Sequence, residues 1–248
     1  MALVKTKGLV IRERPFQEQD KIITLFTENE GKIKAIAKGV RRNRSPLVAA
    51  TQHFAYSEFV YYPGKNFANI NQADLIESFY PLRNNLVKLS LASYVLELID
   101  AFYDDYQGNK AVLKLIIHIL YYISEGKSKS NDALVVALQL KLSEVYGICP
   151  ILTRCVICGK TEELTHFSIE NNGALCKHCS QVEGYTYRVN NELIKQMIYL
   201  LVTPVKNIKD QPFDEVIITR IMDIMDHYIT YHLERNLKTY DFYKEIKN

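Results

Sequence analysis

The sequence predicts an α+β protein: a small β-barrel at the amino terminus, then an all-α domain that carries a metal-binding insertion. Three observations support this prediction. Short β-branched and aromatic runs fill the first eighty residues, and apolar residues recur at three- and four-residue steps from about residue 81. Two Cys-x-x-Cys pairs then interrupt the helical pattern. We therefore expect one domain at residues 1–80 and a second at 81–248, with the insertion at about 150–185.

Composition and charge narrow the class of protein. Of the 248 residues, 48% are hydrophobic and 24% are charged, which is typical of a soluble globular chain. The net charge of +3 is uneven, because residues 1–80 hold twelve Lys and Arg against eight Asp and Glu. No secretory signal is visible, and the longest apolar tract, 112–123, is too short to cross a membrane. Five cysteines without an export signal favour a metal site or free thiols in the cytoplasm.

Five strands are expected in the first domain, at residues 9–11, 22–27, 32–38, 54–62 and 67–76. Turn-forming residues separate them at Pro15, Gly31, Pro46 and Gly64. Gly8 lies where the first strand would have to bend. Short strands with no long helix between them favour a closed or nearly closed barrel, of which the OB-fold is a common example.

The second domain shows five helical patterns. They cover residues 89–103, 112–123, a stretch from the cap at Ser130 to Gly147, 192–202, and 214–237. The tract at 150–185 lacks this periodicity. Within it, residues 167–175 resemble a hairpin that turns at Asn172-Gly173.

The insertion holds two cysteine pairs, Cys155-x-x-Cys158 and Cys176-x-x-Cys179, which lie seventeen residues apart. Two residues between cysteines allow both thiolates to reach one ion, and two such pairs complete a tetrahedron around zinc. We expect one structural Zn²⁺ per chain, because four cysteine ligands leave no position open for water or substrate. His166 or His178 as a replacement ligand, a redox pair, and four unrelated buried cysteines are the alternatives. Cys149 lies outside the pattern.

A basic stretch follows the expected second strand. Between residues 32 and 44 there are six basic side chains and no acidic one: Lys32, Lys34, Lys38, Arg41, Arg42 and Arg44. Strand alternation places the lysines on one face and Ile33, Ala35 and Ala37 on the other, so we expect an outer row of lysines that a loop of arginines extends. Such a row suits phosphate backbones. The alternative is a solvated strand face, and the aromatic residues at 54–67 are expected mainly in the barrel interior.

Groupings that would support catalysis are weak. The sequence has no phosphate-binding glycine loop, zinc-protease motif or nucleophile elbow. Asp100 and Asp104 are interpreted as two solvated carboxylates on one helix face. Asp223, Asp226 and His227 are interpreted in the same way as a solvent-facing cluster on the last helix. Asp20 is interpreted as a turn residue. We therefore expect a protein that is not an enzyme and has no small-molecule substrate.

Several segments together resemble the bacterial recombination-mediator family RecO. They are Gly8-Leu-Val-Ile-Arg-Glu-Arg, Asp20-Lys-Ile-Ile-Thr-Leu-Phe-Thr, the stretch from Glu30 to Ser45, Leu75-Ile-Glu-Ser-Phe, and Ala92-Ser-Tyr-Val-Leu-Glu-Leu-Ile-Asp. The two cysteine pairs fall where many members carry a zinc module. Since other members lack these cysteines, the metal cannot be the core of the function. The likeness extends over the whole chain and is weakest after about residue 185.

The resemblance implies an N-terminal OB-fold and a helical domain with a zinc finger. It also implies binding of single- and double-stranded DNA, annealing of complementary strands, and help for RecA in replacing single-strand-binding protein (SSB). Partners would be DNA, RecR and the acidic SSB C-terminal tail, with RecA affected indirectly, in the cytoplasm and associated with the nucleoid. The family's DNA-binding basic residues match the six named above, and Arg12 and Arg14 extend that set.

Three other functions stay open at this point. An RNA-binding barrel and zinc protein would have the same composition. A protein-interaction scaffold would use its zinc and helices to dock partners. A zinc hydrolase would need a ligand other than cysteine and an open coordination position.

Overall fold

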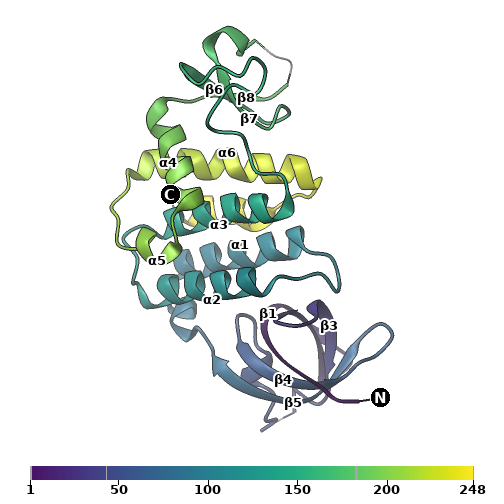
Figure 1. Ribbon diagram of the computed structural model, residues 1–248. Helices are drawn as coiled ribbons and strands as arrows, with labels where there is room; N and C mark the ends of the chain where they lie inside the picture. Colours follow the sequence, from purple (N-terminus) through teal and green to yellow (C-terminus); the bar gives the residue numbers. More distant parts are fainter. Residues whose placement is uncertain (1, 43, 182–183, 248) are drawn as a thin grey trace. The chain divides into compact units, whose positions relative to one another are not determined.

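The computed structural model describes residues 2–42, 44–181 and 184–247 (Figure 1). It divides into two compact units, one that runs to Ser124 and takes in the carboxyl-terminal residues from Ile246, and one at Glu125–Glu245. The expected fold class is confirmed, since a closed barrel precedes a helical part with a cluster of four cysteines. The expected domain boundary at residue 80 stays a prediction. Among the described residues, no helix is both long and apolar enough to cross a bilayer.

The barrel consists of β1 (Val4–Phe16), β2 (Asp20–Thr27), β3 (Gly31–Ala37), β4 (Tyr56–Tyr62) and β5 (Ala68–Glu77). Its strand order is β1-β2-β3-β5-β4, closed by a parallel contact of Ala35 and Ile36 with Ala68 and Asn69. β1 is longer than expected because one end pairs with β4 and the other with β2. Gly8 lies where both pairings overlap, and a Cβ there would approach Thr27 Cγ2 to 3.2 Å.

Period-two patterning explains the barrel interior. Ile23, Leu25, Ile33, Ala35 and Phe59 are fully or almost fully buried in one core cluster with the inward residues of the other strands. The short helix η1 (Ala49–Thr51) follows the loop after β3. Ala50 joins the same core, so the connection to β4 also helps to close the barrel.

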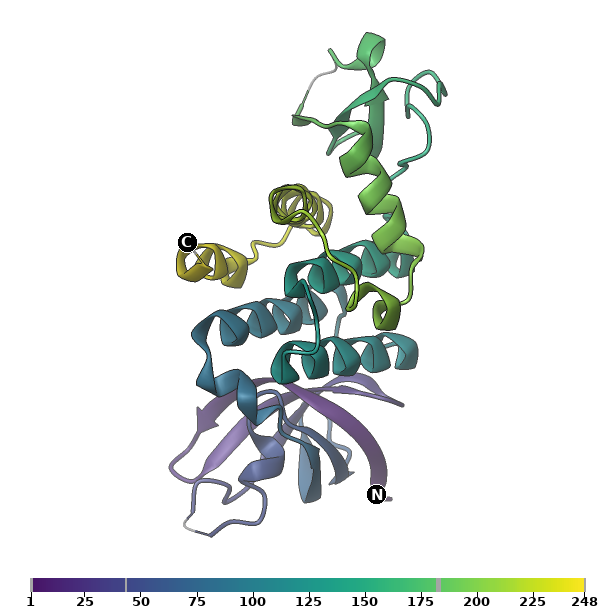
Figure 2. The ribbon, with the colours of Figure 1, turned by 90° about the vertical axis from the view of Figure 1, so that its left-hand side faces the viewer.

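Three further elements complete the first unit. They are η2 (Tyr80–Asn84), α1 (Leu86–Phe102) and α2 (Lys110–Glu125), and the last of these begins beside the barrel in both ribbon views (Figures 1 and 2). The loop between α1 and α2 lies against β3, where Lys32 N–H donates to Gln107 O at 2.8 Å and Tyr106 N–H donates to Lys32 O at 2.7 Å. Gly31 makes this approach close, because a Cβ at that residue would lie 2.3 Å from Gln107.

The second unit is built around α3 (Asn131–Tyr146), which is buried on most of its surface and packs against α4 (Asn191–Val202), α5 (Val205–Ile208) and α6 (Glu215–Leu233). Ser130 caps α3 as expected, since its side chain accepts from Ala133 N–H. The helix expected at 214–237 is too long. Glu234 adopts φ 51° and ends α6, and α7 (Lys238–Lys247) follows separately.

The insertion contains β6 (Leu164–Ser168), β7 (Gly173–Cys176), the short helix η3 (Lys177–Cys179) and β8 (Thr186–Arg188). We call residues 150–189 the cysteine module. Its sheet has the order β7-β6-β8, so the expected hairpin is present. The turn lies slightly earlier than expected: Ser168 pairs with Gly173, which places the turn before that glycine and not at it.

Candidate nucleic-acid interface and metal centre

The barrel exterior along β3 differs in part from the expected row of lysines. Ile33, Ala35 and Ala37 face the core as predicted. The expectation that Lys32 lies on an exposed outer face is wrong, because its residue exposure is only 6%. The loop after α1 covers this end of β3 and removes Lys32 from solvent.

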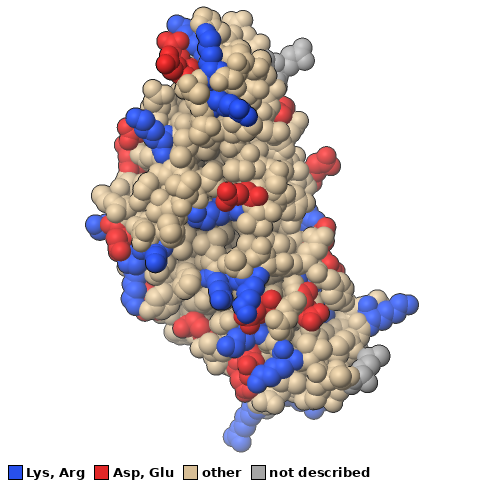
Figure 3. Space-filling model, viewed as in Figure 1, with Lys and Arg blue, Asp and Glu red and all other residues tan. Residues whose placement is uncertain are grey.

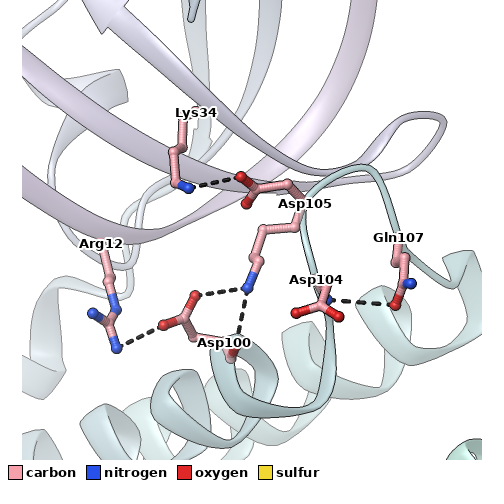
Figure 4. A network of polar contacts seen from close by, with 7 residues as sticks. Arg12, Lys34, Asp100, Asp104, Asp105 and Gln107 are labelled. Carbon is pink, nitrogen blue, oxygen red and sulfur yellow. Dashed lines mark hydrogen bonds and ion pairs between the residues drawn. The ribbon is translucent and has the colours of Figure 1, made fainter. Parts of the chain in front are cut away.

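A network of ion pairs joins this part of the barrel to α1 and the loop after it (Figure 4). Asp100 receives Arg12 Nη2 at 2.6 Å on one carboxylate oxygen and Lys32 Nζ at 3.1 Å on the other. Lys32 Nζ also donates to the Asp100 carbonyl at 3.0 Å. Lys34 Nζ contacts Asp105 Oδ2 at 2.7 Å, but both side chains remain more than 40% exposed. These two carboxylates offset part of the positive charge of the three cations nearest to α1.

The interpretation of Asp100 and Asp104 as two solvated carboxylates on one helix face is therefore corrected. Asp100 has a side-chain exposure of 17% and is held between two cations. Asp104 follows the end of α1, and its backbone N–H donates to Gln107 Oε1 at 3.4 Å. The sequence did not indicate that Asp100 is paired, because the cations that bind it are 68 and 88 residues away along the chain.

The other basic residues lie after β3 and remain exposed: Lys38, Arg41, Arg42 and Arg44, here called the cationic loop. Within the described residues, none of the four side chains has an ion pair with a carboxylate. Gly39 N–H donates to Asp20 Oδ1 at 2.7 Å, and Arg41 N–H donates to Gln19 O at 2.9 Å. Asp20 and Gln19 thus hold the backbone while the cationic ends point to solvent.

Two hollows flank the cationic loop, and Lys38, Gly39 and Arg42 line both of them. One has a volume of about 520 Å³ and is bordered by the β1–β2 turn from Gln17 to Asp20. The other has a volume of about 620 Å³ and is bordered by residues 71–74 of β5. The Arg42 guanidinium donates from Nε to Gln19 Oε1, which orients it between the hollows.

The space-filling view shows how charge is distributed on one face of the molecule (Figure 3). Over the barrel, cations alternate with carboxylates and do not form an unbroken strip. This mixture agrees with the ion pairs Lys5–Glu58 and Lys21–Glu13 on other strands. The cationic loop therefore differs from most of the barrel surface in its lack of carboxylate partners.

The aromatic residues near this surface lie mainly in the interior. Phe54, Phe59 and Tyr61 are at most 4% exposed, and burial raises the pKa of the Tyr61 hydroxyl to about 12. Tyr62 is exposed at 43%. Most of these rings fill the barrel, as the sequence predicted, and only Tyr62 presents a broad open face.

The four cysteines of the module form one cluster. The sulfur atoms of Cys155, Cys158, Cys176 and Cys179 all lie within 4.8 Å of one another, and Cys158 Sγ is 3.7 Å from Cys176 Sγ. Ligands at 2.3 Å around a tetrahedral ion would lie about 3.8 Å apart. Such a cluster could bind a metal ion. Among the described residues, neither His166 nor His178 belongs to it.

Backbone hydrogen bonds shape the first cysteine pair. Cys155 N–H donates to Lys160 O at 2.7 Å, and Gly159 N–H donates to Cys155 O at 2.9 Å, with Gly159 at φ 77°. Val156 N–H donates to Ala174 O at 2.9 Å and so joins this turn to β7, which ends at the third cysteine.

The same geometry shifts the pKa values of two of the thiols, Cys155 and Cys179, in opposite directions. Burial opposes ionisation of Cys155, but hydrogen bonds from backbone N–H groups outweigh it and lower the pKa of Cys155 to about 6. Desolvation and hydrogen bonds to the neighbouring cysteines raise the pKa of Cys179 to about 12. A bound cation would favour the thiolate form of all four and would release protons on binding.

The interpretation of Asp223, Asp226 and His227 as a solvent-facing group is only partly correct. Asp223 Oδ1 accepts from the Tyr240 hydroxyl at 2.8 Å, and His227 Nδ1 shares a hydrogen bond of 2.8 Å with Tyr187. All three residues are half-buried. No metal cluster involves them within the described part of the chain.

The closed barrel, the helices and the four-cysteine cluster define a two-part protein, in which a small β-barrel precedes a helical part with a metal-binding type of module. Two family models match the chain: "Recombination protein O N terminal" at residues 1–79 and "Recombination protein O C terminal" at residues 83–241. The chain belongs to the RecO family of DNA repair proteins.

Curated relatives agree with this assignment over their full length. The DNA repair protein RecO of Alkaliphilus metalliredigens is 33% identical over 98% of this chain and 100% of its own. Those of Acetivibrio thermocellus and Caldanaerobacter subterraneus are each 32% identical. The first match covers 99% of this chain and 98% of the relative, and the second covers both chains completely.

Proposed function

We propose that this protein is a DNA-binding recombination mediator that acts without catalysis. It anneals complementary single strands and helps RecA to replace SSB on single-stranded DNA. The observation that carries the proposal is the cationic loop, since its four exposed side chains lack carboxylate partners among the described residues, and three of them, Lys38, Arg42 and Arg44, line hollows on one barrel. Membership of the DNA repair family supports DNA as the ligand.

Physical chemistry explains how such a surface promotes annealing. Two nucleic-acid backbones repel each other, and cations that neutralise phosphates reduce this repulsion and release condensed counterions. Base pairing then supplies the free energy, so no bond in the protein or the DNA has to break. Lys38, Arg41, Arg42 and Arg44 are the proposed phosphate contacts. Of the six basic residues expected from the sequence, Lys32 is the least suited because it is buried against Asp100.

Lys34 and Arg12 occupy an intermediate position. Both are exposed, but Asp105 and Asp100 respectively lie within 2.7 Å of them. A phosphate would have to compete with these carboxylates for the same N–H donors. We therefore propose that they contribute less to DNA affinity than the cationic loop.

We further propose that the four-cysteine cluster binds one structural Zn²⁺. The Cys158–Cys176 sulfur separation of 3.7 Å, close to the tetrahedral value, supports zinc, and four thiolates leave no position for a reacting water. The zinc-hydrolase alternative lacks the ligand it requires, because the cluster contains only cysteines among the described residues. RecR, the SSB tail and, indirectly, RecA are the proposed protein partners, in the cytoplasm at the nucleoid.

Removal of the arginines tests the proposal. Arg41→Ala with Arg42→Ala and Arg44→Ala should weaken binding of single-stranded DNA and slow the annealing of SSB-coated strands, while the melting temperature stays nearly unchanged. If four phosphates are contacted, the logarithmic salt slope of the wild type on single strands is about −3, and the variant should lose about 2 of it. Fluorescence anisotropy at several salt concentrations measures both quantities.

A matched control removes three other exposed cations of the same barrel, Lys5, Lys7 and Lys65, by substitution with alanine. It alters net charge equally but leaves the cationic loop intact. Equal affinity of the arginine variant and the wild type at low salt would refute the DNA-binding proposal. Equal losses in both variants would show that only overall charge matters, and competition with RNA of equal length would reveal an RNA ligand.

A further inference from the structure

The cysteine module holds a second cationic pocket, separate from the barrel. It has a volume of about 690 Å³ and lies between β6, β8, the start of η3 and the amino end of α4. Three basic side chains line it, His166, Lys177 and Arg188, and we call it the module pocket. The ribbon views place the small sheet of the module next to the start of α4 (Figures 1 and 2).

Strand register brings these three residues together. His166 of β6 lies directly opposite Arg188 of β8 in an antiparallel pair, so both side chains leave the same face of the sheet. Lys177 follows the last residue of β7, on the other edge of β6, and its N–H donates to Glu163 O at 3.2 Å. Residues from three separate segments therefore surround one hollow.

The cations of the module pocket are available to a ligand. Lys177 and Arg188 are exposed, and neither side chain has an ion pair within the described residues. This contrasts with Lys32 and Arg12, which both form ion pairs with Asp100. His166 Nδ1 shares a hydrogen bond of 3.0 Å with the Thr165 hydroxyl, and both residues line the pocket.

Two more features determine the charge of the site. α4 starts at the pocket, with Asn190 as its cap, and the backbone N–H groups of the first turn carry a partial positive charge that Glu192 in the same turn partly offsets. Glu163 is the carboxylate that lines the pocket among the described residues. Two permanent cations against one carboxylate leave a net positive site that suits an anion with hydrogen-bond acceptors.

We propose that the module pocket is a second binding site for the phosphates of single-stranded nucleic acid. The choice of ligand rests on the proposed DNA-binding function, whereas the site itself is independent of the cationic loop. A chain with two phosphate-binding surfaces can hold two strands or two segments of one strand, which is what annealing requires. Glu163 then limits affinity, so that strands can also be released.

Paired substitutions in the full-length, metal-loaded protein test the site. Lys177→Ala with Arg188→Ala should reduce affinity for fluorescent oligodeoxythymidine and lower the logarithmic salt slope by about 1.4, which corresponds to two phosphate contacts on a single strand. Glu163→Gln should have the opposite effect and raise affinity, because it removes the carboxylate from the pocket. Metal content and melting temperature are measured for each variant to verify that the module remains folded.

The matched control is Arg154→Ala with Lys160→Ala. Both residues are exposed cations of the same module, but neither lines the pocket. The control removes the same charge and should leave the salt slope within error of the wild type. Equal losses in the two double variants would overturn the proposal, since they would reduce the effect to the module's general charge.

Other outcomes distinguish failure of the module-pocket proposal from failure of the proposed DNA-binding function. If the cationic-loop variant loses DNA affinity and Lys177→Ala with Arg188→Ala does not, the module pocket is rejected while the proposed function stands. If neither variant loses affinity, both are rejected. If the pocket variant loses affinity for a glutamate-rich peptide but not for DNA, the pocket is a peptide site and the phosphate proposal is overturned.

Discussion

At the scale of single residues, burial divides six similar cations into two groups. Lys32 and Lys34 lie two residues apart on β3, yet the first is 6% exposed and the second is an exposed residue. Asp100 compensates for the burial of the Lys32 ammonium, because it supplies both a carboxylate oxygen and a backbone carbonyl as acceptors. Its principal contacts therefore attach α1 to the barrel, whereas the cations further along the chain are exposed to solvent.

Asp100→Asn tests this division. We expect the free energy of unfolding to fall by about 3 kcal/mol, because breaking a buried pair leaves the Lys32 ammonium without its counter-charge. Asp105→Asn is the control, since its pair with Lys34 is exposed and should change stability by about 0.5 kcal/mol or less. Urea denaturation of both variants measures the difference. Equal effects of the two substitutions would contradict the buried role of Asp100.

At the scale of elements, the connection between η1 and β4 contains a half-buried histidine, His53. His53 Nε2–H donates to Ile11 O of β1 at 3.1 Å, and its ring packs 4.2 Å from that of Phe54. Burial lowers the pKa of His53 below its ordinary value, and the hydrogen bond to Ile11 only partly opposes this effect. The neutral ring is thus the form that the folded barrel accepts.

Acid should therefore destabilise the barrel through His53. Below the ordinary histidine pKa of about 6.5, the unfolded chain binds a proton that the folded chain does not, so stability falls as pH decreases from 7 to 5. His53→Gln should remove this contribution of the histidine, so that the stability of the variant depends less on pH than that of the wild type. Thermal unfolding followed across that pH range, for the variant and the wild type, gives the comparison. An unchanged slope in His53→Gln would disprove the assignment.

Helix ends show which local features the sequence could predict. Ser130 and Gly147 bound α3 as expected, because a cap side chain and a left-handed glycine act through neighbouring backbone groups alone. The end of α6 could not be predicted in this way. Glu234 adopts a left-handed conformation that its residue type does not favour, while Tyr240 of the following α7 binds back to Asp223 of α6.

At the scale of the whole molecule, the two units should respond differently to metal removal. Chelation should release close to one zinc per chain. It should also loosen the cysteine module, because the cluster links the first cysteine pair to the end of β7. The barrel core contains no cysteine and should keep its hydrogen-exchange protection. Exchange measured before and after chelation tests this, and a metal-free chain that melts as cooperatively as the loaded one would contradict a structural role.

Features that depend on local patterns could be predicted from the amino-acid sequence. Alternation predicted the barrel strands and their inward residues, helical periodicity predicted most helices, and the spacing of the cysteines predicted which four sulfur atoms would meet. Each of these follows from interactions between residues that are near in sequence or from a ligand geometry that spacing reveals. The cationic loop was also visible as an uninterrupted basic run.

The packing of distant segments determines which cations face solvent and which carboxylates pair with them. Lys32 and Asp100 are 68 residues apart, and no local pattern relates a strand of the barrel to the far end of α1. The module pocket has the same origin, because His166, Lys177 and Arg188 meet through strand register and not through spacing. The strength of an ion pair depends on the distance between the two charges in space and on how far they are removed from water. Both quantities are set only when the strands and helices pack together.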